Sequence, residues 1–436
     1  MTSLWSASSQ MPSFEPLRDN IKTDVLIIGG GMAGLLCARF LHDSGVDYAL
    51  LEADSICGGV TCGTTAKITA LHGLRCEKLM YRFGVEKTRQ YYLANLNAIE
   101  RYAQMCRDVD CAFERRDAYI YSAVGNRSIE RECKALNRIG IDADVVKCRE
   151  LPFGATAVRM RDQAQFDPLR FASAIARGLR IYDHTPVRSL RGCTACTDSG
   201  EVQAKRIIIA THFPFVNRHG SYFLKLYQER SYVIALENAL KIKGMYLDDR
   251  PAGLSFRMHG DLLLVGGQNG RTGSKSGGWR ALEDISKCLF PHSRVRYRWA
   301  TQDCMTLDGI PYIGHYSALT PEWYVATGFN KWGMTSSMVA AELLTELVFG
   351  REKACTSVFS PSRSIIRTQL AVNFGHAVKE LLTPTSPRCP HMGCALQWNA
   401  AERTWDCPCH GSRFDRHGKL LENPSQKDMS PPIDIQ

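Results

Sequence analysis

Apolar and polar positions near the start of the chain alternate in blocks that predict strands and helices. Residues 25–28 (Val-Leu-Ile-Ile) form a short β-branched run, a helical pattern follows and breaks at Gly45, and a second apolar run ends at Glu52. The stretch KRIIIATH, residues 205–212, predicts a further strand. Strands that alternate with helices indicate an α/β unit built on a parallel sheet.

The middle of the chain has a different pattern, which predicts a second lobe. Residues 75–109 have the period of one or two helices, and the stretch AFERRDAYIYSAV alternates like a strand. A helix is expected over residues 167–179, where Asp167 precedes a proline. Several strand-like runs follow one another over residues 222–265, so we expect an antiparallel sheet in an inserted α+β lobe.

These patterns predict an ordered series of segments along the 436 residues. We expect an amino-terminal extension at 1–20, a two-lobe domain at 21–350 with its inserted lobe at about 75–150 and 213–295, a connecting helix or linker at 351–383 with the helix over 363–382, and a small tail domain at 384–436. At roughly 150 residues per domain, the length suits two or three domains.

Composition narrows the class of protein. Hydrophobic residues make up 44% and charged residues 22% of the chain, which is ordinary for a globular protein. No signal-peptide pattern and no run of eighteen apolar residues is apparent, so we expect a cytoplasmic protein without a transmembrane segment. The net charge of +10 is spread without a dense basic stripe, so no nucleic-acid partner is expected. Most of the seventeen cysteines stand singly in apolar segments, as reduced buried thiols do.

Three glycines follow the first strand in the spacing of a dinucleotide-binding turn. Gly29 permits the tight turn, Gly31 lets a pyrophosphate approach the backbone, and Gly34 lets the following helix pack on the sheet. The amino terminus of that helix favours phosphate groups. Glu52, at the end of the second strand, can accept hydrogen bonds from ribose hydroxyls. The sequence therefore predicts a dinucleotide site.

Two further stretches distinguish between dinucleotides. A polar, glycine-rich segment follows Glu52, and WYVATGFNKWGMTSSMVAAELLTELV forms a late strand, loop and helix. With the first glycine motif, these stretches resemble the D-amino-acid-oxidase-like class of FAD-dependent oxidoreductases over about residues 20–350. His212 stands where that class commonly has a glycine. No second glycine motif follows a strand, so no NAD(P)H domain is expected.

The resemblance implies FAD as cofactor, with the isoalloxazine ring close to residues 64–67 and 328–335. The residues expected to bind FAD are Gly29, Gly31, Gly34, Glu52, Gly59, Thr64, Thr65, Lys67, Val187, Gly328, Gly333 and Met334. The weak candidates for catalysis are Lys67, His259 and Lys331, with His72 and Arg257 as further polar residues expected to border the flavin.

The tail contains four residues with the spacing of a metal site. Cys389 and His391 form one pair, and Cys407 and His410 form another, each in a short loop with proline and glycine. Two cysteines and two histidines can hold a structural zinc ion. They can also hold a [2Fe–2S] cluster, with the cysteines on one iron and the histidines on the other.

The stretches CPHMGC and CPCHGS resemble the Rieske iron–sulfur family. The resemblance implies that Cys389, His391, Cys407 and His410 are the ligands of a [2Fe–2S] cluster, that Cys394 and Cys409 are the pair that forms a disulfide in respiratory members, and that Ser412 bonds a cluster sulfide. Phe414 replaces the tyrosine of high-potential members, which should lower the potential. Few residues precede the first loop, so we expect a truncated, mainly β subdomain that leans on the flavin domain.

Together the two parts resemble a bacterial family of FAD-dependent oxidoreductases with a carboxy-terminal Rieske domain. We expect an enzyme that passes electrons between a small organic substrate, preferably an amine or amino acid, and an external one-electron partner through the cluster. Two alternatives remain at this stage: an electron-transfer protein without its own small-molecule substrate, or the same flavoenzyme with a structural zinc tail. The direction of electron flow and the oligomeric state also stay open.

Overall fold

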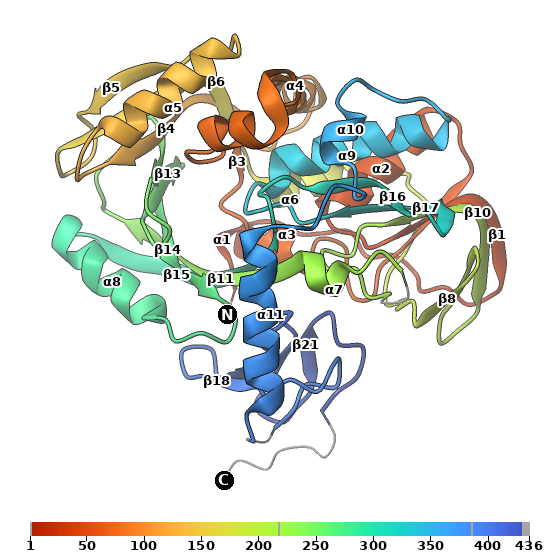
Figure 1. Ribbon diagram of the computed structural model, residues 1–436. Coiled ribbons are helices and arrows are strands. Elements are labelled where there is room, and N and C mark those ends of the chain that lie inside the picture. Colours follow the sequence, from red (N-terminus) through yellow and green to blue (C-terminus); the bar gives the residue numbers. More distant parts are fainter. Residues whose placement is uncertain (1, 217–218, 385–386, 430–436) are drawn as a thin grey trace.

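The computed structural model describes residues 2–216, 219–384 and 387–429, and its chain folds around two large sheets and one small one (Figure 1). The first sheet has the order β16-β17-β10-β1-β2-β7, with β8 and β9 attached at β10. Its strands are β1 (Ile21–Ile28), β2 (Tyr48–Leu51), β7 (Ile181–Tyr182), β8 (Ser189–Arg191), β9 (Thr194–Cys196), β10 (Glu201–Ile209), β16 (Tyr312–Ser317) and β17 (Thr320–Thr327). The strands β17, β10, β1, β2 and β7 run parallel, as the alternation of strands and helices predicted.

The second sheet has the order β15-β11-β14-β13-β12-β4-β6-β3, with β5 beside β6. Its strands are β3 (Lys67–Ile68), β4 (Glu114–Ser122), β5 (Asp144–Cys148), β6 (Ala155–Gln165), β11 (Leu226–Glu237), β12 (Met245–Asp248), β13 (Ser255–His259), β14 (Leu262–Arg271) and β15 (Arg294–Thr306). The pairings are antiparallel except for that of β12 with β4. The strands β6 and β15 lie largely outside the residue ranges expected for the inserted lobe.

Helices cover both sheets, and their ends follow local chemistry. The helices of the two lobes are α1 (Leu4–Ser8), α2 (Met32–Asp43), α3 (Val60–Gly63), α4 (Cys76–Met105), α5 (Arg127–Arg138), α6 (Pro168–Ile175), α7 (Tyr222–Lys225), α8 (Gly278–Leu289) and α9 (Gly333–Val348). A non-helical residue, Gly84 with φ +81°, interrupts α4. The side chain of Asp167 caps α6 by accepting from the N–H groups of Leu169 and Arg170. The expected extension of α6 to Leu179 was wrong, since the helix ends at Ile175.

The connection to the tail consists of α10 (Thr356–Phe359) and α11 (Thr368–Leu382). The expected start of the second helix at Arg363 was wrong, because that side chain is bound elsewhere. Its guanidinium group pairs with Asp308 at 3.0 Å and donates to the carbonyl groups of Ile310 and Pro311. These contacts fix Arg363 against the first lobe, five residues before the helix begins.

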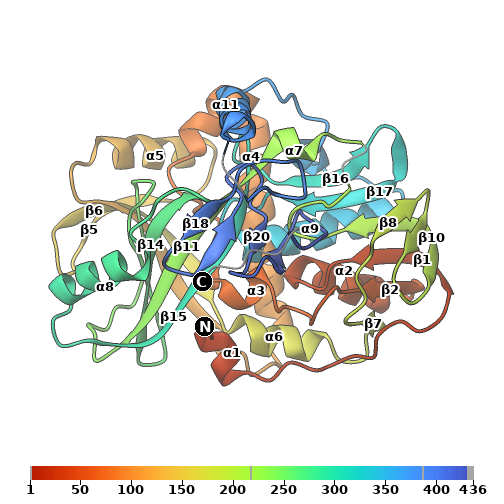
Figure 2. The same cartoon turned by 90° about the horizontal axis from the view of Figure 1, so that it is seen from below.

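The tail carries a four-stranded antiparallel sheet of β18 (Gln397–Asn399), β19 (Thr404–Asp406), β20 (Arg413–Phe414) and β21 (Leu420–Glu422). Seen from below, this sheet lies over the junction of the two lobes (Figure 2). The tail thus contacts both lobes, as the short sequence before its first loop led us to expect. Among the helices in the described ranges, none combines the length and the apolar character that crossing a membrane requires.

Candidate FAD and iron–sulfur sites

The turn between β1 and α2 has no room for side chains at two of its glycines. Gly29 adopts φ +106°, and a Cβ atom there would lie 2.6 Å from the carbonyl oxygen of Ala210. A Cβ at Gly34 would lie 1.8 Å from the carbonyl oxygen of Gly29. The carboxylate of Glu52 accepts from the N–H of Gly30 at 2.6 Å. This close-packed turn with an acidic side chain at its edge fits a bound dinucleotide.

The structure brings together the two segments that were expected to border the flavin ring. The hydroxyl of Thr335, on α9, donates to the carbonyl group of Thr69 at 3.2 Å, two residues beyond Lys67. The same hydroxyl lies 3.1 Å from Nε2 of His72. Lys67 is partly buried there, and loss of hydration, with a smaller effect from Arg257, lowers its pKa to about 7. Residues just beyond the first segment therefore contact the second, although more than 250 residues separate them.

The remaining expected FAD contacts lie along the first lobe. Gly59 directly precedes α3, Gly328 (φ +71°) follows β17, and Gly333 and Met334 begin α9. Val187 follows β7 and packs against the apolar core of the first sheet. These positions stay predictions as contacts to FAD.

His212 occupies the position where the related class commonly has a glycine. Its backbone adopts φ +64°, the left-handed conformation that glycine tolerates best. Its carbonyl group accepts a hydrogen bond from the hydroxyl of Thr327, and its Nε2 lies 3.1 Å from Oε1 of Gln228. The chain therefore keeps the glycine-like backbone at this position while it places a side chain toward β11.

Arg257, on β13, is fully buried close to the same site. Its Nη1 donates to the carbonyl group of Ala66 at 2.8 Å, and its Nε has no hydrogen-bond partner among the described residues. Burial lowers the pKa of its guanidinium group to about 9. The neighbouring His259 is partly buried, and burial lowers its pKa to about 4. A buried cation with an unused donor is suited to an anionic ligand.

Two other candidates are held by protein groups. The ammonium of Lys331 pairs with Glu229 at 3.1 Å and lies 3.6 Å from Asp303. Nδ1 of His72 lies 2.6 Å from the hydroxyl of Tyr91, and the His72 ring stacks on the ring of Trp332. These contacts favour structural roles for Lys331 and His72.

The four residues expected to bind the cluster lie in two adjacent loops of the tail. Cys389, Cys407 and His410 are buried, and the rings of His391 and His410 lie 5.0 Å apart between centroids. Burial lowers the pKa of His391 to about 4 and that of His410 to about 3, which keeps both imidazoles neutral, as metal ligation requires. Nε2 of His410 lies 3.1 Å from the carbonyl oxygen of Phe223. Nδ1 of His410 is buried without a hydrogen-bond partner in the described part of the chain, so it is available as a ligand.

Of the two cysteines in this set, Cys389 is the one prepared for ligation, because a hydrogen bond to Cys389 and burial raise the pKa of the Cys407 thiol well above its usual value. A hydrogen bond from Cys407 lowers the pKa of the Cys389 thiol to about 7, and N–H groups of its own loop and the hydroxyl of Ser412 act in the same direction. A thiolate therefore forms at low cost at Cys389. This donor set, two cysteines and two neutral histidines around a buried space, fits a Rieske cluster.

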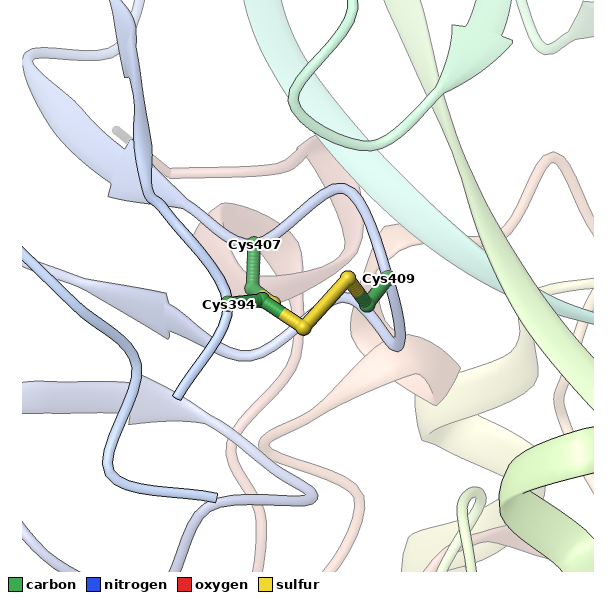
Figure 3. Close-up of side chains that lie close together, drawn as sticks. All are labelled: Cys394, Cys407 and Cys409. Atoms are coloured by element: carbon green, nitrogen blue, oxygen red, sulfur yellow. A yellow bond between two sulfur atoms is a disulfide. The ribbon is translucent and has the colours of Figure 1, made fainter. Parts of the chain in front are cut away.

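Three sulfur atoms of the tail lie close together, as Figure 3 shows for Cys394, Cys407 and Cys409. Cys394 and Cys409 are joined by a disulfide, so these sulfur atoms are not free thiolates and do not form a metal site with Cys407. The disulfide instead connects the two loops that carry the expected ligands. Phe414 is fully buried in the small apolar core beside them.

Polar side chains of the second lobe hold the loop that carries Cys407 and His410. Arg271 donates to the carbonyl groups of Pro408 and Cys409 at 2.7 and 3.1 Å. Gln228 donates to the carbonyl of His410 at 2.7 Å, and Gln302 to that of Gly411 at 2.8 Å. These three residues were not predicted from the sequence, where each appears as a polar residue within or beside a strand-like run.

Buried charges complete this interface. Arg230, on β11, pairs with Glu402 at 2.5 Å and with Glu422 at 3.0 Å. Arg413, within the tail, pairs with the same two carboxylates and with Asp406. Burial alone would raise the pKa of Glu422, but the two guanidinium groups outweigh it and hold that pKa at about 2.

Comparisons with known proteins agree with both sites. Residues 24–347 match the model of the FAD-dependent oxidoreductase family (DAO), and residues 360–432 match the model of the Rieske [2Fe–2S] domain. The chain is 33% identical to the Rieske 2Fe-2S iron-sulfur protein YhfW of Bacillus subtilis, over 98% of this chain and 96% of that protein. It is 23% identical to the gamma-glutamylputrescine oxidoreductase of Escherichia coli, over 79% of this chain and 88% of that protein.

A solved structure shares the fold of the two lobes. The glycine oxidase of Geobacillus kaustophilus superposes with a TM-score of 0.66 at 18% identity, covering 79% of this chain and 99% of that structure. The cofactors are FAD in the two-lobe domain and a [2Fe–2S] cluster in the tail, so the zinc alternative is set aside. The chain belongs to the DAO family of FAD-dependent oxidoreductases and carries a carboxy-terminal Rieske domain.

Proposed function

We propose that this enzyme oxidises a small amine or amino acid that carries a carboxylate, and that the electrons leave one at a time through the tail to a partner protein. When bound, FAD supplies two-electron chemistry and the cluster supplies one-electron transfer. The observation that carries the substrate class is the buried guanidinium group of Arg257.

Among the described residues, no carboxylate forms an ion pair with the buried cation of Arg257. Glu114 and Asp167 lie near enough to act on its pKa, but neither is hydrogen-bonded to it, and the hydrogen bonds that Arg257 makes to described residues go to main-chain carbonyl groups. Desolvating a charge is costly unless it is paired. A substrate carboxylate would supply that partner.

The amine part of the proposal has two sources of support. The names of two similar proteins, glycine oxidase and gamma-glutamylputrescine oxidoreductase, refer to nitrogen compounds, and glycine is an amine with a carboxylate. Lys67, whose pKa is about 7, can also take a proton from an ammonium substrate near neutral pH. The neutral amine is the form that can be oxidised, so a proton acceptor of this kind would assist the reaction.

The proposed electron route is supported by the way the tail packs. His410 lies against the second lobe through the carbonyl of Phe223, and Gln228 connects the His410 backbone to the side chain of His212. His410 is buried in this interface, whereas His391 is only partly buried. One expected ligand thus faces the flavoprotein lobes, and the other lies nearer to solvent, where a partner protein could approach.

Anaerobic mixing tests this function. The oxidised holoenzyme is mixed with amines, amino acids and 2-hydroxy acids, while flavin absorbance and the EPR signal of the reduced cluster are followed. We expect carboxylate-bearing amines to bleach the flavin and then to generate the cluster signal. If no compound bleaches the flavin but a reduced ferredoxin-like donor rapidly reduces both centres, the chain is an electron-transfer protein and the proposal is wrong.

A substitution tests the role of Arg257. The Arg257→Leu variant should lose about 100-fold in kcat/KM for carboxylate-bearing substrates, because removing one partner of a buried charge pair costs about 3 kcal/mol. The Arg257→Lys variant should retain part of the activity. The exposed Arg188, which pairs with Asp198 on the first sheet, provides a control as Arg188→Leu.

A further inference from the structure

The short helix α1 places an aromatic side chain inside the protein. The hydroxyl of Ser3 caps the helix by accepting from the N–H of Ser6. Leu4 and Trp5 are buried, and the indole of Trp5 has no solvent exposure at all. Full burial is uncommon for a residue as large as tryptophan, so the neighbours of Trp5 enclose it tightly. A helix of five residues is too short to show a periodic pattern, so this burial could not be predicted from the sequence.

Trp5 contacts both lobes at the site argued above. Its Nε1 donates to the carbonyl group of Thr64 at 2.7 Å. The guanidinium carbon of Arg257 lies 5.3 Å from the centre of its ring, and the ring of His259 meets it edge-on at 4.8 Å. Thr64 belongs to the segment expected at the flavin ring, whereas Arg257 and His259 belong to β13 of the second sheet. The indole therefore bridges the lobes beside the proposed carboxylate site.

The rest of the amino-terminal segment holds α1 in this position. The hydroxyl of Ser9 donates to the carboxylate of Asp167 at 3.4 Å, and the N–H of Leu17 donates to the hydroxyl of Thr185 at 3.0 Å. In Figure 2, α1 lies next to α6, and contacts join α1 to both α3 and α6. The segment is thus fixed at several points along the first lobe, and Trp5 has one defined place.

We propose that Trp5 forms a wall of the substrate site, where it limits the size of the substrate and holds the Arg257 guanidinium in place. This inference rests on the proposed function, because it takes the Arg257 region as the place where the substrate binds. A cation over an indole is held by the ring electrons, and an indole fills space that a larger substrate would need. The N–H bond to Thr64 sets the orientation of the ring.

Two variants and one matched control test the proposal. Trp5→Ala removes the wall, and Trp5→Phe keeps a ring but loses the donor. Trp279→Ala is the control, because Trp279 is equally a buried indole that donates to a carbonyl, here that of Trp299, with Arg298 over its ring. Trp279 belongs to α8 and packs with Tyr232 in a different core cluster. Circular dichroism and bound FAD show whether each variant is folded.

The first readout needs no substrate. Sulfite bleaches an oxidised flavin that it can reach, and its rate of bleaching is measured for each holoenzyme. We expect faster bleaching in Trp5→Ala, a smaller change in Trp5→Phe, and the unchanged rate in Trp279→Ala. An equal rate in Trp5→Ala and the parent enzyme, including no bleaching in either, overturns the proposal even if the substrate class proves correct.

The second readout uses the substrates found by anaerobic mixing. The ratio of kcat/KM for a bulky amine to that for a small one should rise roughly tenfold in Trp5→Ala, since losing side-chain volume in a binding site changes selectivity by such factors. The control should keep the parent ratio. A ratio that is unchanged in Trp5→Ala, or that rises equally in Trp279→Ala, contradicts the assignment of Trp5 to the substrate site.

Discussion

Replacing Arg230 by Met should separate the tail from the flavoprotein lobes. Arg230 lies on β11, and its guanidinium group reaches into the interface. Its nitrogen atoms lie 2.8 and 2.5 Å from the carboxylate oxygens of Glu402 and 3.0 Å from that of Glu422. In the variant, Arg413 alone would neutralise these two carboxylates and Asp406 as well. Three carboxylates around one cation leave net negative charge in a region with little access to water, since the side chains of Asp406, Glu402 and Glu422 are 1%, 10% and 30% exposed.

The magnitude follows from the burial of the pair. Arg230 and Glu402 each have a side-chain exposure of only 10%, so solvent screening is weak. Breaking a buried ion pair by removing one partner costs about 3–5 kcal/mol. That energy corresponds to a factor of roughly 100 to 4000 in the equilibrium between docked and undocked tail. Replacing Glu402 by Gln in the same chain should recover part of the loss, because the stranded charge is then removed.

Stopped-flow reduction provides the assay. Flavin bleaching by substrate should be unaffected in Arg230→Met, whereas the cluster signal should follow it more slowly, and the tail should be cut sooner in limited proteolysis. Arg298→Met is the matched control, since Arg298 lies on the neighbouring β15 and makes a long, half-exposed pair with Glu283 at 3.6 Å. If Arg230→Met matches the control in both electron transfer and proteolysis, the ion pairs do not hold the tail in place.

Three further predictions concern the tail. The pKa of Glu422 is about 2 in the folded tail and about 4.3 in the unfolded chain. Its ionised carboxylate therefore stabilises the tail fully above about pH 4.3, and this stabilisation is lost as the pH falls toward about 2. Acid titration of tail unfolding should show the loss of stability in that pH range. Phe414→Tyr should raise the reduction potential of the cluster by adding a buried donor, and a potentiometric EPR titration that shows no rise would contradict this. Replacing Cys394 and Cys409 by Ala should lower the free energy of unfolding by about 3 kcal/mol, measured by denaturant titration.

The parts of the structure that the sequence predicted are those with a local physical cause. Gly29 and Gly34 lie where a Cβ atom would collide with the backbone, so the close packing of the turn itself requires the glycine motif seen in the sequence. Asp167 was read as a helix start because a carboxylate can accept from the free N–H groups of the first turn. The ligand spacing of the tail was equally local. Each of these features can be recognised within a few residues.

The features that the sequence did not predict depend on residues far apart in the chain. Arg363 was placed in a helix because its neighbours suit one, but Asp308 and carbonyl groups of the first lobe hold it outside. Trp5 and Gln228 follow no period, and only folding brings them to Thr64 and His410. Interfaces of this kind are specified by shape and by single polar contacts, which leave no regular pattern in a sequence.

The composition of the tail explains why it depends on the two lobes for its stability. Its apolar core contains Leu396, Phe414 and Met429, and the other buried members are the four cysteines of the ligand and disulfide pairs. A core of this size contributes little to the folding free energy of the tail. The disulfide, the cluster and the interface must therefore supply the rest of its stability. Unlike apolar packing, the ion pairs of Arg230 are directional, and they permit one orientation of the tail. That orientation buries His410 against the lobes and leaves His391 nearer to solvent, so the contacts that stabilise the tail also set the two ends of the proposed electron route.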